Sequence, residues 1–398
     1  MSEEKLVPKL RFPSYSSEWH SYTLGEILTF YSTNSFSREK LNYDTGSVKN
    51  IHYGDIHTKF PSIVSIDNNK DIPFINDDLD LSKFSEDQYL REGDLIIADA
   101  SEDYEDIGKA IEVKDINNEK VLAGLHTILA RDENDMAVNG FKAYLFSTNN
   151  LKTKIKIIAN GISVLGISKN NLSKLNVEIP SKKEQQNIVS FISDIDKKIE
   201  LLEKKHQLYL DFKNYLMQQI FAQKLRFNFD DEWKQYKLKD VLTVKSSSIS
   251  INQLEENTGD YPLYGASGFL KNIDFCEMDV DYISIVKDGS GVGNLSFHEK
   301  NSSIVNTSQY LLPKKNFNIN FLYYLLQTIN LMKYVNGSSI PHIYFKDYCI
   351  EKINIPSLDE QEKIGKLFVD VDITMENLNK NINATQEFKK GLLQQMFV

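Results

Sequence analysis

Several residue patterns are scarce or missing in this chain of 398 residues, and each absence narrows its class. Only two cysteines occur, Cys276 and Cys349, and their spacing fits neither a zinc site nor a disulfide framework, so we expect a reducing compartment. A signal peptide and an apolar run long enough to span a bilayer are also missing. These absences together predict a soluble, cytoplasmic protein that has no membrane partner.

Signatures of catalysis are missing too. Neither a P-loop, Gly-x-x-x-x-Gly-Lys-Ser/Thr, nor the Asn/Asp-Pro-Pro-aromatic motif of methyltransferases occurs. The seven histidines are scattered, without the close spacing of a metal site. Asp194 and Asp196 stand two apart on a predicted helix, as do Asp370 and Asp372, so we interpret them as solvated or partner-facing. The sequence therefore predicts no catalytic residue, no metal and no cofactor of its own.

Net positive charge is lacking as well, because the formal net charge is −10 at pH 7. Residues 67–106 hold 14 acidic and 3 basic residues, so this stretch is not expected on a phosphate backbone. Hydrophobic residues make up 41% of the chain, which is enough to bury cores in two or three domains. Any basic surface must therefore be confined to small faces.

One stretch of about 40 residues occurs twice without a gap, at 180–221 and at 356–397. Each copy opens on Pro-Ser-x-x-Glu-Gln, and its apolar residues then recur at alternating steps of four and three. That heptad pattern predicts one long helix per copy, each the natural coiled-coil partner of the other. Ser181 with Glu184 predicts a capping box at the start of the first helix, and the second copy repeats it. The seam lapses at His206 and Lys213, which are either wet positions or surfaces that another subunit covers.

The duplication extends beyond the helices. The motifs Leu-Arg-Phe, Glu-Trp and Leu-x-x-Ile/Val-Leu-Thr occur in this order within residues 10–29 and again within 225–243. Between them and each helix lie short runs rich in Ile, Val and Tyr, broken by Asn, Gly and Asp, which predict irregular sheets. The predicted fold is therefore α/β (α+β), an internal pseudo-two-fold repeat of two similar globular domains separated by two long helices. Its predicted segments are 1–179 (first domain), 180–222 (first helix), 223–355 (second domain) and 356–398 (second helix).

Weaker matches align the two globular regions with each other. The aligned segments are 93–97 with 280–284, 107–109 with 292–294, 141–146 with 321–326, and 160–161 with 336–337. Between these landmarks the two regions differ freely. A shared scaffold with different loops suggests the same task on two different targets.

The sharpest local signal is the glycine-rich run at 286–294, Val-Lys-Asp-Gly-Ser-Gly-Val-Gly-Asn. It is similar to loops that bind S-adenosylmethionine or a dinucleotide, but such loops require a helix directly afterwards. Residues 295–305 alternate like a strand instead, so we favour a strand–turn–strand unit at a surface. The glycines would let a partner approach the backbone closely.

The doubled motifs together resemble the specificity subunit of type I restriction–modification systems. The resemblance rests on Ile-Pro-Ser-x-x-Glu-Gln at 179–185 and 355–361, on the Phe-Lys…Leu-x-Gln-Gln-x-Phe closings and on the Trp-bearing openings, and it covers nearly the whole chain. It implies a subunit that is not itself an enzyme. It also implies two target recognition domains, each reading one half of a bipartite double-stranded DNA sequence, and an antiparallel coiled coil that acts as a ruler between them.

The resemblance further implies partner subunits. Two methyltransferase subunits would use S-adenosylmethionine to methylate adenine N6, and two motor/endonuclease subunits would use ATP and magnesium to restrict unmethylated DNA. Two other functions remain open from the residues alone: a structural coiled-coil adaptor between two proteins, and a stand-alone DNA methyltransferase or nuclease with an unrecognised site. Turnover by the isolated chain would favour the enzyme, and sequence-specific DNA protection by an assembled complex would exclude the pure adaptor.

Loops would place lysines on phosphates and polar side chains on base edges. In the second domain the predicted DNA contacts are Tyr264, Ser267, Lys287, Ser290, Asn294, Asn336 and Ser338. In the first domain they are Lys109, Asn160, Ser163 and Lys169. Tyr144 and Tyr324 are predicted to lie in the cores. The first domain lacks the glycine-rich turn, because residues 98–106 carry five acids where the second has 287–291.

Overall fold

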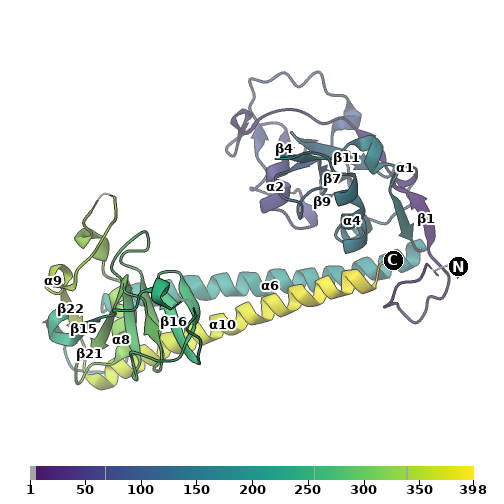
Figure 1. Ribbon diagram of the computed structural model, residues 1–398. Coiled ribbons are helices and arrows are strands. Elements are labelled where there is room, and N and C mark those ends of the chain that lie inside the picture. The colour runs from purple at the N-terminus through teal and green to yellow at the C-terminus, as the bar shows by residue number, and fades with distance from the viewer. Residues whose placement is uncertain (1–5, 68, 255, 338) are drawn as a thin grey trace. The chain divides into compact units, whose positions relative to one another are not determined.

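The computed structural model describes residues 6–398, apart from residues 68, 255 and 338 and the side chain of Gln253. The chain divides into two compact units, Met1–Leu201 with Ile382–Val398, and Leu202–Asn381. Each unit contains one globular domain and a section of each of two long helices (Figure 1). Within the described residues, no helix is both long and apolar enough to cross a membrane.

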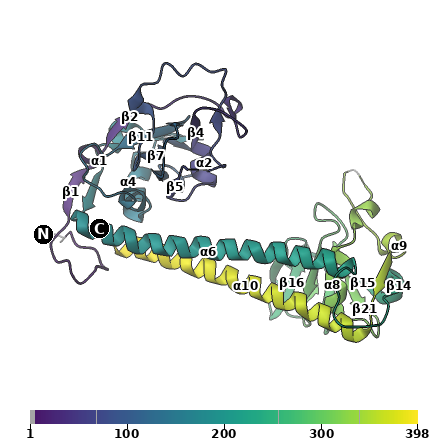
Figure 2. The ribbon, with the colours of Figure 1, turned by 180° about the vertical axis from the view of Figure 1, so that it is seen from behind.

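The two long helices are α6 (Lys182–Phe221) and α10 (Leu358–Gln395), and they confirm the helices predicted from the repeat. In each unit a section of α6 lies beside a section of α10 (Figures 1 and 2). The start of α6 contacts the end of α10 in the first unit, and the end of α6 contacts the start of α10 in the second, so the helices run antiparallel. The predicted seam is largely buried, at Ile188, Ile192, Ile195, Leu216, Ile220, Ile364, Phe368, Val371, Leu378, Ile382, Leu392 and Met396.

The first globular domain is built on a five-stranded sheet with the order β2-β11-β7-β9-β5. Its strands are β2 (Thr29–Tyr31), β5 (Ile63–Ser65), β7 (Leu95–Ala98), β9 (Ala110–Lys114) and β11 (Thr127–Arg131). A smaller sheet with the order β10-β4-β6-β3 contains β3 (Leu41–Asn42), β4 (Lys49–Ile51), β6 (Phe74–Ile75) and β10 (Val121–Ala123). Two strand pairs complete it: β1 (His20–Thr23) with β13 (Asn176–Ile179), and β8 (Ala100–Ser101) with β12 (Leu165–Gly166). Its helices are α1 (Leu24–Ile27), α2 (Tyr53–Thr58), α3 (Phe141–Phe146), α4 (Asn149–Ile158) and α5 (Lys169–Leu172).

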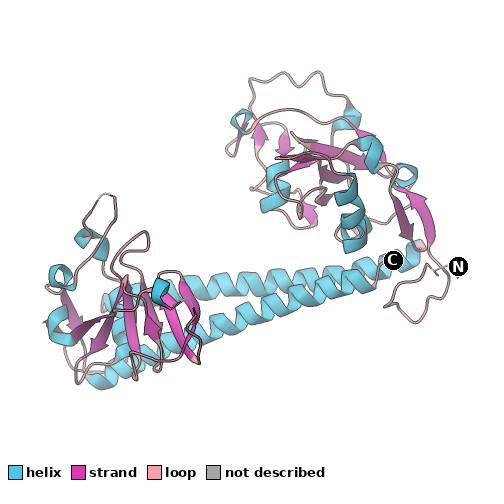
Figure 3. Cartoon of the chain, viewed as in Figure 1, coloured by secondary structure: helices cyan, strands magenta, loops and turns pink. Residues whose placement is uncertain are grey.

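The second globular domain repeats this plan with fewer strands (Figure 3). Its main sheet has the order β15-β21-β18-β19, formed by β15 (Leu242–Ser246), β18 (Tyr282–Val286), β19 (Leu295–His298) and β21 (Ser308–Pro313). A second sheet contains β16 (Tyr261–Gly265), β17 (Gly268–Ile273) and β20 (Ser303–Ile304), and β14 (Lys234–Lys237) pairs with β22 (Lys352–Ile355). Its helices are α7 (Leu238–Val241), α8 (Ile319–Gln327) and α9 (Phe345–Tyr348).

The main sheets of the two domains share their strand order, with β2-β11-β7-β9 matching β15-β21-β18-β19. The predicted alignment of their central strands is wrong by one residue. Leu95 and Ile97 face the core of the first domain, as Ile283 and Ile285 face the core of the second. The predicted alignment set Leu95 against Tyr282, and a slip of one residue turns every side chain to the opposite face of a sheet. Both faces of these strands are buried, so the apolar pattern could not fix the register.

The Pro-Ser-x-x-Glu-Gln motif binds the opening segment of each repeat to a long helix, and the capping box predicted at the start of α10 is wrong. The buried Glu184 carboxylate accepts hydrogen bonds from Nε and Nη2 of Arg11 at 2.7 and 2.8 Å. Glu360 accepts the same pair from Arg226 at 3.1 and 2.7 Å. Within the described residues, Ser357 Oγ is buried without a hydrogen-bond partner, so it does not cap α10. The arginines of the two Leu-Arg-Phe motifs engage the glutamates that the capping box would need.

A tyrosine, an aspartate and a lysine join each globular domain to both long helices. Asp196 of α6 accepts a hydrogen bond from the hydroxyl of Tyr144 at 2.9 Å and pairs with Lys389 of α10 at 2.5 Å. The second unit repeats this triad with Tyr324, Asp372 and Lys213. Both tyrosines are buried, as predicted, and a buried hydroxyl needs an acceptor. The prediction that Asp196 and its counterpart are solvated or partner-facing is therefore wrong.

Candidate nucleic-acid interface

Three loops of the second domain meet, and all three carry predicted DNA contacts. The glycine-rich turn between β18 and β19 is joined to loop 336–342 by a hydrogen bond from Gly289 N to Pro341 O at 2.9 Å. A Cβ atom added to Gly291 would lie 3.5 Å from Cβ of Ala266, so the turn between β16 and β17 also borders it. Segments far apart in the sequence thus form one polar, glycine-rich surface, which we name the second-domain loop face.

The glycine-rich run forms a strand–turn–strand unit, which confirms the prediction. Strand β19 follows the turn directly and pairs antiparallel with β18. Gly289 and Gly293 have φ angles of +94° and +86°, a region that side-chain-bearing residues rarely adopt. A loop that binds S-adenosylmethionine or a dinucleotide would place the start of a helix here, so this turn does not fit that alternative.

The predicted contacts of the second domain differ in how accessible they are. Lys287 is half-buried, and its Nζ lies 3.7 Å from a carboxylate oxygen of Asp288. Ser338 lies outside the described residues. Four predicted contacts are exposed on the second-domain loop face: Ser267, Ser290, Asn294 and Asn336. These side chains are free to meet a ligand without rearrangement of the core.

Tyr264 contacts the interior more than the surface. Its half-buried ring lies 4.4 Å from the ring of His298, which lies 5.0 Å from the buried ring of Tyr282. Nε2 of His298 is 2.9 Å from Oγ of Ser284, and burial lowers the pKa of His298 to about 4. The imidazole is therefore neutral near pH 7. The packed, uncharged rings of Tyr264, His298 and Tyr282 thus support the turn between β16 and β17 from the interior of the domain.

The first domain places its counterpart turn in the same way. Gly108 N donates to Ala98 O at 3.2 Å, as Gly293 N donates to Val286 O at 2.8 Å. Both glycines have positive φ angles, +72° and +86°. The predicted alignment of 107–109 with the second-domain turn is therefore confirmed. The turn between β7 and β9 is longer and acidic, whereas its counterpart is short and rich in glycine.

A matching hairpin loop stands next to each turn. Asn160 pairs with Gly166 across the first loop, as Asn336 pairs with His342 across the second. Both loops therefore keep the Asn-Gly landmark that was predicted from the sequence. Ser163 is exposed at the tip of the first loop, and Asn160 is exposed at its base.

The two lysines predicted in the first domain are held by backbone carbonyls. Lys109 Nζ donates to His57 O at 2.7 Å, and Lys169 Nζ donates to Tyr31 O at 2.6 Å. Burial lowers the pKa of Lys169. Both ammonium groups would have to exchange a present partner for a phosphate, so they are poorer candidates than the sequence suggested.

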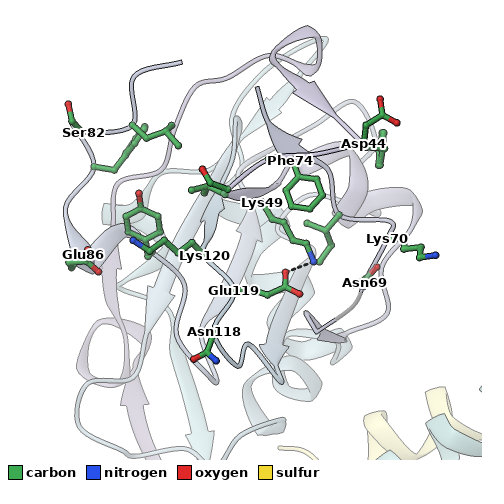
Figure 4. Close-up of a pocket in the computed structure, with 18 residues that line it drawn as sticks. Asp44, Lys49, Asn69, Lys70, Phe74, Ser82, Glu86, Asn118, Glu119 and Lys120 are labelled. Carbon is green, nitrogen blue, oxygen red and sulfur yellow. Dashed lines mark ion pairs between the residues drawn. The ribbon is translucent and has the colours of Figure 1, made fainter. Parts of the chain in front are cut away.

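A groove in the first domain gathers lysines that the sequence analysis did not single out (Figure 4). Its volume is about 1350 Å³, and it is lined by the rings of Tyr43, Phe74, Phe84 and Tyr89 and by Lys49, Lys70 and Lys120. Lys49 forms an ion pair with Glu119 inside the groove (Figure 4). Lys120 Nζ lies 5.5 Å from the ring centroid of Tyr89. The lining comes from separate segments in and around the acidic stretch, and no local sequence signal marks such an assembly.

Two domains of one topology, each bearing polar loops that differ in chemistry, define a duplicated recognition protein. A model of the family described as "Type I restriction modification DNA specificity domain" matches residues 16–208 and again residues 230–386. The chain therefore belongs to this family. It is a DNA-specificity subunit, which recognises DNA and is not a catalytic subunit.

Individual relatives agree with the family. The chain is 25% identical over 247 residues to a putative type I specificity subunit of Mycoplasma pneumoniae. The matched region covers 60% of this chain and 90% of that protein. It is 28% identical over 182 residues to the type I restriction enzyme MjaVIII specificity subunit of Methanocaldococcus jannaschii. This matched region covers 42% of each chain. The crystal structure of the type I restriction–modification S subunit from M. genitalium matches with a TM-score of 0.64 at 16% identity, covering 98% of this chain and 99% of that one. This last likeness shows a shared fold.

Proposed function

We propose that each globular domain reads one half of a bipartite double-stranded DNA target. Residues 1–179 and 223–355 are the recognition domains in this proposal, and the helices at 180–222 and 356–398 are the spacer between the half-sites. The main supporting observation is that equivalent turns and hairpin loops stand on one sheet topology while their side chains differ. One scaffold with two sets of loops suits two different half-sites.

The proposal assigns the chemistry to partner subunits. The chain would assemble with two methyltransferase subunits that transfer a methyl group from S-adenosylmethionine to adenine N6. Two motor/endonuclease subunits, with ATP and magnesium, would complete the restriction complex. Membership of a DNA-specificity family supports this division of labour.

Methylome sequencing tests the proposal directly. The chain would be expressed with its partner methyltransferase subunits in a host that lacks restriction–modification systems, and a strain without this chain would serve as the control. We expect methyladenine in one bipartite motif, with two defined half-sites and a fixed gap, only when the chain is present. Methylation that does not depend on the chain, or a motif with a single undivided site, would refute the proposal.

Replacing Lys287 by alanine should weaken DNA binding and flatten its dependence on salt. Lys287 is the first residue of the glycine-rich turn on the second-domain loop face. Its ammonium group can leave the carboxylate of Asp288 and bind a phosphate oxygen instead. Loss of one phosphate contact should reduce the slope of log K against log salt by about one. Fluorescence anisotropy of the assembled methyltransferase complex at several salt concentrations measures both quantities.

The matched control is Lys300, an exposed lysine of the same domain. It lies beyond the opposite end of β19 from the glycine-rich turn, so Lys300→Ala removes the same charge away from the loop face. We expect this variant to keep the wild-type salt slope. If Lys287→Ala behaves like Lys300→Ala in both affinity and slope, Lys287 does not contact a phosphate.

A further inference from the structure

The residue that follows strand β7 in the first domain is Asp99, and the backbone holds it on both sides. Asp99 N donates to His126 O at 3.1 Å, and Asp99 O accepts from Ile167 N at 2.9 Å. These bonds connect the start of the acidic turn to β11 and to the end of the hairpin loop at 160–166. Asp99 therefore has a fixed position, even though it lies in a loop.

Lys287 occupies the same position in the second domain. Lys287 N donates to Thr307 O at 2.8 Å, and Lys287 O accepts from Ile343 N at 2.9 Å. The two domains thus place residues of opposite charge at one equivalent site, directly beside the hairpin loop. The backbone hydrogen bonds hold Asp99 and Lys287 in the same position. The two sites therefore differ in the charge of this side chain, and so in the groups that they can bind.

The surroundings of Asp99 differ from those of an ordinary surface aspartate. Its side chain is 31% exposed, and Oδ1 lies 3.6 Å from Nδ1 of His126. His126 has a φ angle of +55°, an uncommon conformation for a residue with a side chain and one that clusters at functional sites. The ring of Tyr53 lies 5.3 Å from the His126 ring. Burial raises the pKa of the Asp99 carboxyl, and His126 opposes that rise.

Two neighbouring acids of the turn form ion pairs with lysines, whereas Asp99 lies beside His126. Glu105 pairs with Lys156 at 2.6 Å, and Asp106 pairs with Lys109 at 3.9 Å. These two pairs, together with the positive charge of Lys169 near Asp99, reduce the negative charge that approaching DNA would meet there. The carboxylate of Asp99 would therefore face DNA with part of the surrounding repulsion removed.

A carboxylate accepts hydrogen bonds and cannot donate them, and phosphate oxygens repel it. In the major groove the donors that DNA offers are the amino groups of cytosine N4 and adenine N6. We infer that Asp99 is a specificity-determining residue that accepts a hydrogen bond from the amino group of a cytosine or an adenine in the half-site read by the first domain. The inference rests on the proposed function, and it gives the equivalent position a different role in each domain, because Lys287 would donate to a phosphate while Asp99 would accept from a base.

The first test compares methylomes of the wild type, Asp99→Ala, Asp99→Asn and Glu102→Gln, each assembled with the partner methyltransferase subunits. Glu102 is an exposed acid of the same turn, so its variant removes one negative charge without touching Asp99. We expect Asp99→Ala to relax one position in one half-site and to leave the other half-site and the gap unchanged. Asp99→Asn keeps an acceptor and should retain part of the preference, and Glu102→Gln should keep the wild-type motif.

The second test removes the amino group from the DNA instead. Duplexes would carry purine in place of adenine, or pyrimidin-2-one in place of cytosine, at the relaxed position. The wild-type complex should bind such a duplex about 5-fold to 100-fold more weakly than the parent duplex. Asp99→Ala should bind the two duplexes equally, and if Asp99→Ala fails to fold, Asp99→Asn takes its place with a reduced difference.

An unchanged Asp99→Ala motif, relaxation spread over both half-sites, or equal sensitivity of wild type and variant to the missing amino group would overturn the inference. Loss of all methylation by a variant that melts at the wild-type temperature would overturn it too. A wild-type methylome without any bipartite motif would overturn the proposed function instead, so the two failures are distinguishable.

Discussion

Replacing Lys142 by methionine is expected to lower the free energy of unfolding of the first unit by about 3–5 kcal/mol near neutral pH. Lys142 Nζ lies 3.0 Å from Glu112 Oε1, and the two side chains are only 4% and 1% exposed. Without the lysine, the carboxylate stays buried against the N–H groups of Gly140 and Ala143, at 2.7 and 3.0 Å. A buried charge that loses its partner is among the most destabilising changes known for single substitutions.

Urea denaturation followed by tryptophan fluorescence measures this effect on the full chain. The sequence has two tryptophans, and each compact unit contains one of them, Trp19 in the first and Trp233 in the second. Trp19 is buried in the same core as Phe141 of α3, so it reports on the helix that carries Lys142. In a Trp233→Phe background the signal comes from the first unit alone. An unchanged transition midpoint in Lys142→Met would contradict the prediction.

The loss should also depend on pH in a defined direction. Burial raises the pKa of Glu112 above its ordinary 4.5 while the lysine is present, and removal of Lys142 should raise it further. The folded variant then holds a proton that the unfolded chain releases, so its stability falls as pH rises above the ordinary pKa. The deficit relative to the wild type should therefore shrink as pH falls from about 7 towards 5. A deficit that stays constant over this range would show that charge is not its cause.

The second domain supplies the matched control, because it folds without this ion pair. At the position of Glu112, strand β19 carries Phe297, whose ring packs 5.9 Å from the ring of Tyr323 in α8. Replacement of a buried ion pair by apolar residues is often neutral or stabilising. We expect the double variant Glu112→Leu/Lys142→Met to recover most of the lost stability. A double variant as unstable as the single one would assign the loss to packing.

Inserting one heptad into each long helix should move the methylated motif. Seven helical residues add about 10 Å, which corresponds to about three base pairs of DNA. The insertions belong after Lys204 in α6 and after Lys380 in α10, because these two positions lie opposite each other along the paired helices. Counting nine residues along each helix from the Lys213–Asp372 pair leads to Lys204 in α6 and to the residue after Lys380 in α10. If the helices set the separation of the half-sites, both half-sites should persist while the gap grows by about three base pairs.

Methylome sequencing reads out this experiment, and the original motif should lose its methylation. The control is a heptad inserted into α6 alone, which puts the Lys213–Asp372 and Lys389–Asp196 pairs out of step. That variant should unfold at a lower temperature and should not produce a defined new gap. A doubly inserted variant that keeps the original gap would disprove the spacer role of the helices.

The similarity between the two halves of the sequence predicted more of the fold than any single motif did. The long helices followed from two copies of one heptad pattern, because helix periodicity is encoded by residues three and four apart. Their antiparallel direction was implied only by the family resemblance, and the contacts between the helices show it. The prediction of a strand–turn–strand unit at the glycine-rich run likewise depended on the residues that directly follow the run, which form β19. The alignment of the turns at Gly108 and Gly293 held because a positive φ angle there favours glycine in both domains.

Errors arose where the partner of a side chain lies far away in the sequence. Glu184 is 173 residues from Arg11, so a local motif could predict only a capping box. Asp196 has its tyrosine and lysine partners on α3 and α10, and nothing near it in the sequence marks them. The strand register failed because β7 and β18 are buried on both faces, which removes the alternation that fixes a register.

The sequence by itself determined that this protein is a duplicated unit of one α/β domain and one long helix, because repetition and heptad periodicity are patterns of the residues themselves. Only the tertiary structure decided which side chains share a site. It joined three loops into the second-domain loop face, and it placed Asp99 where the other repeat has Lys287. The physical reason is that hydrogen bonds between strands and loops set such neighbours across long stretches of chain, and the pattern of apolar residues does not specify them.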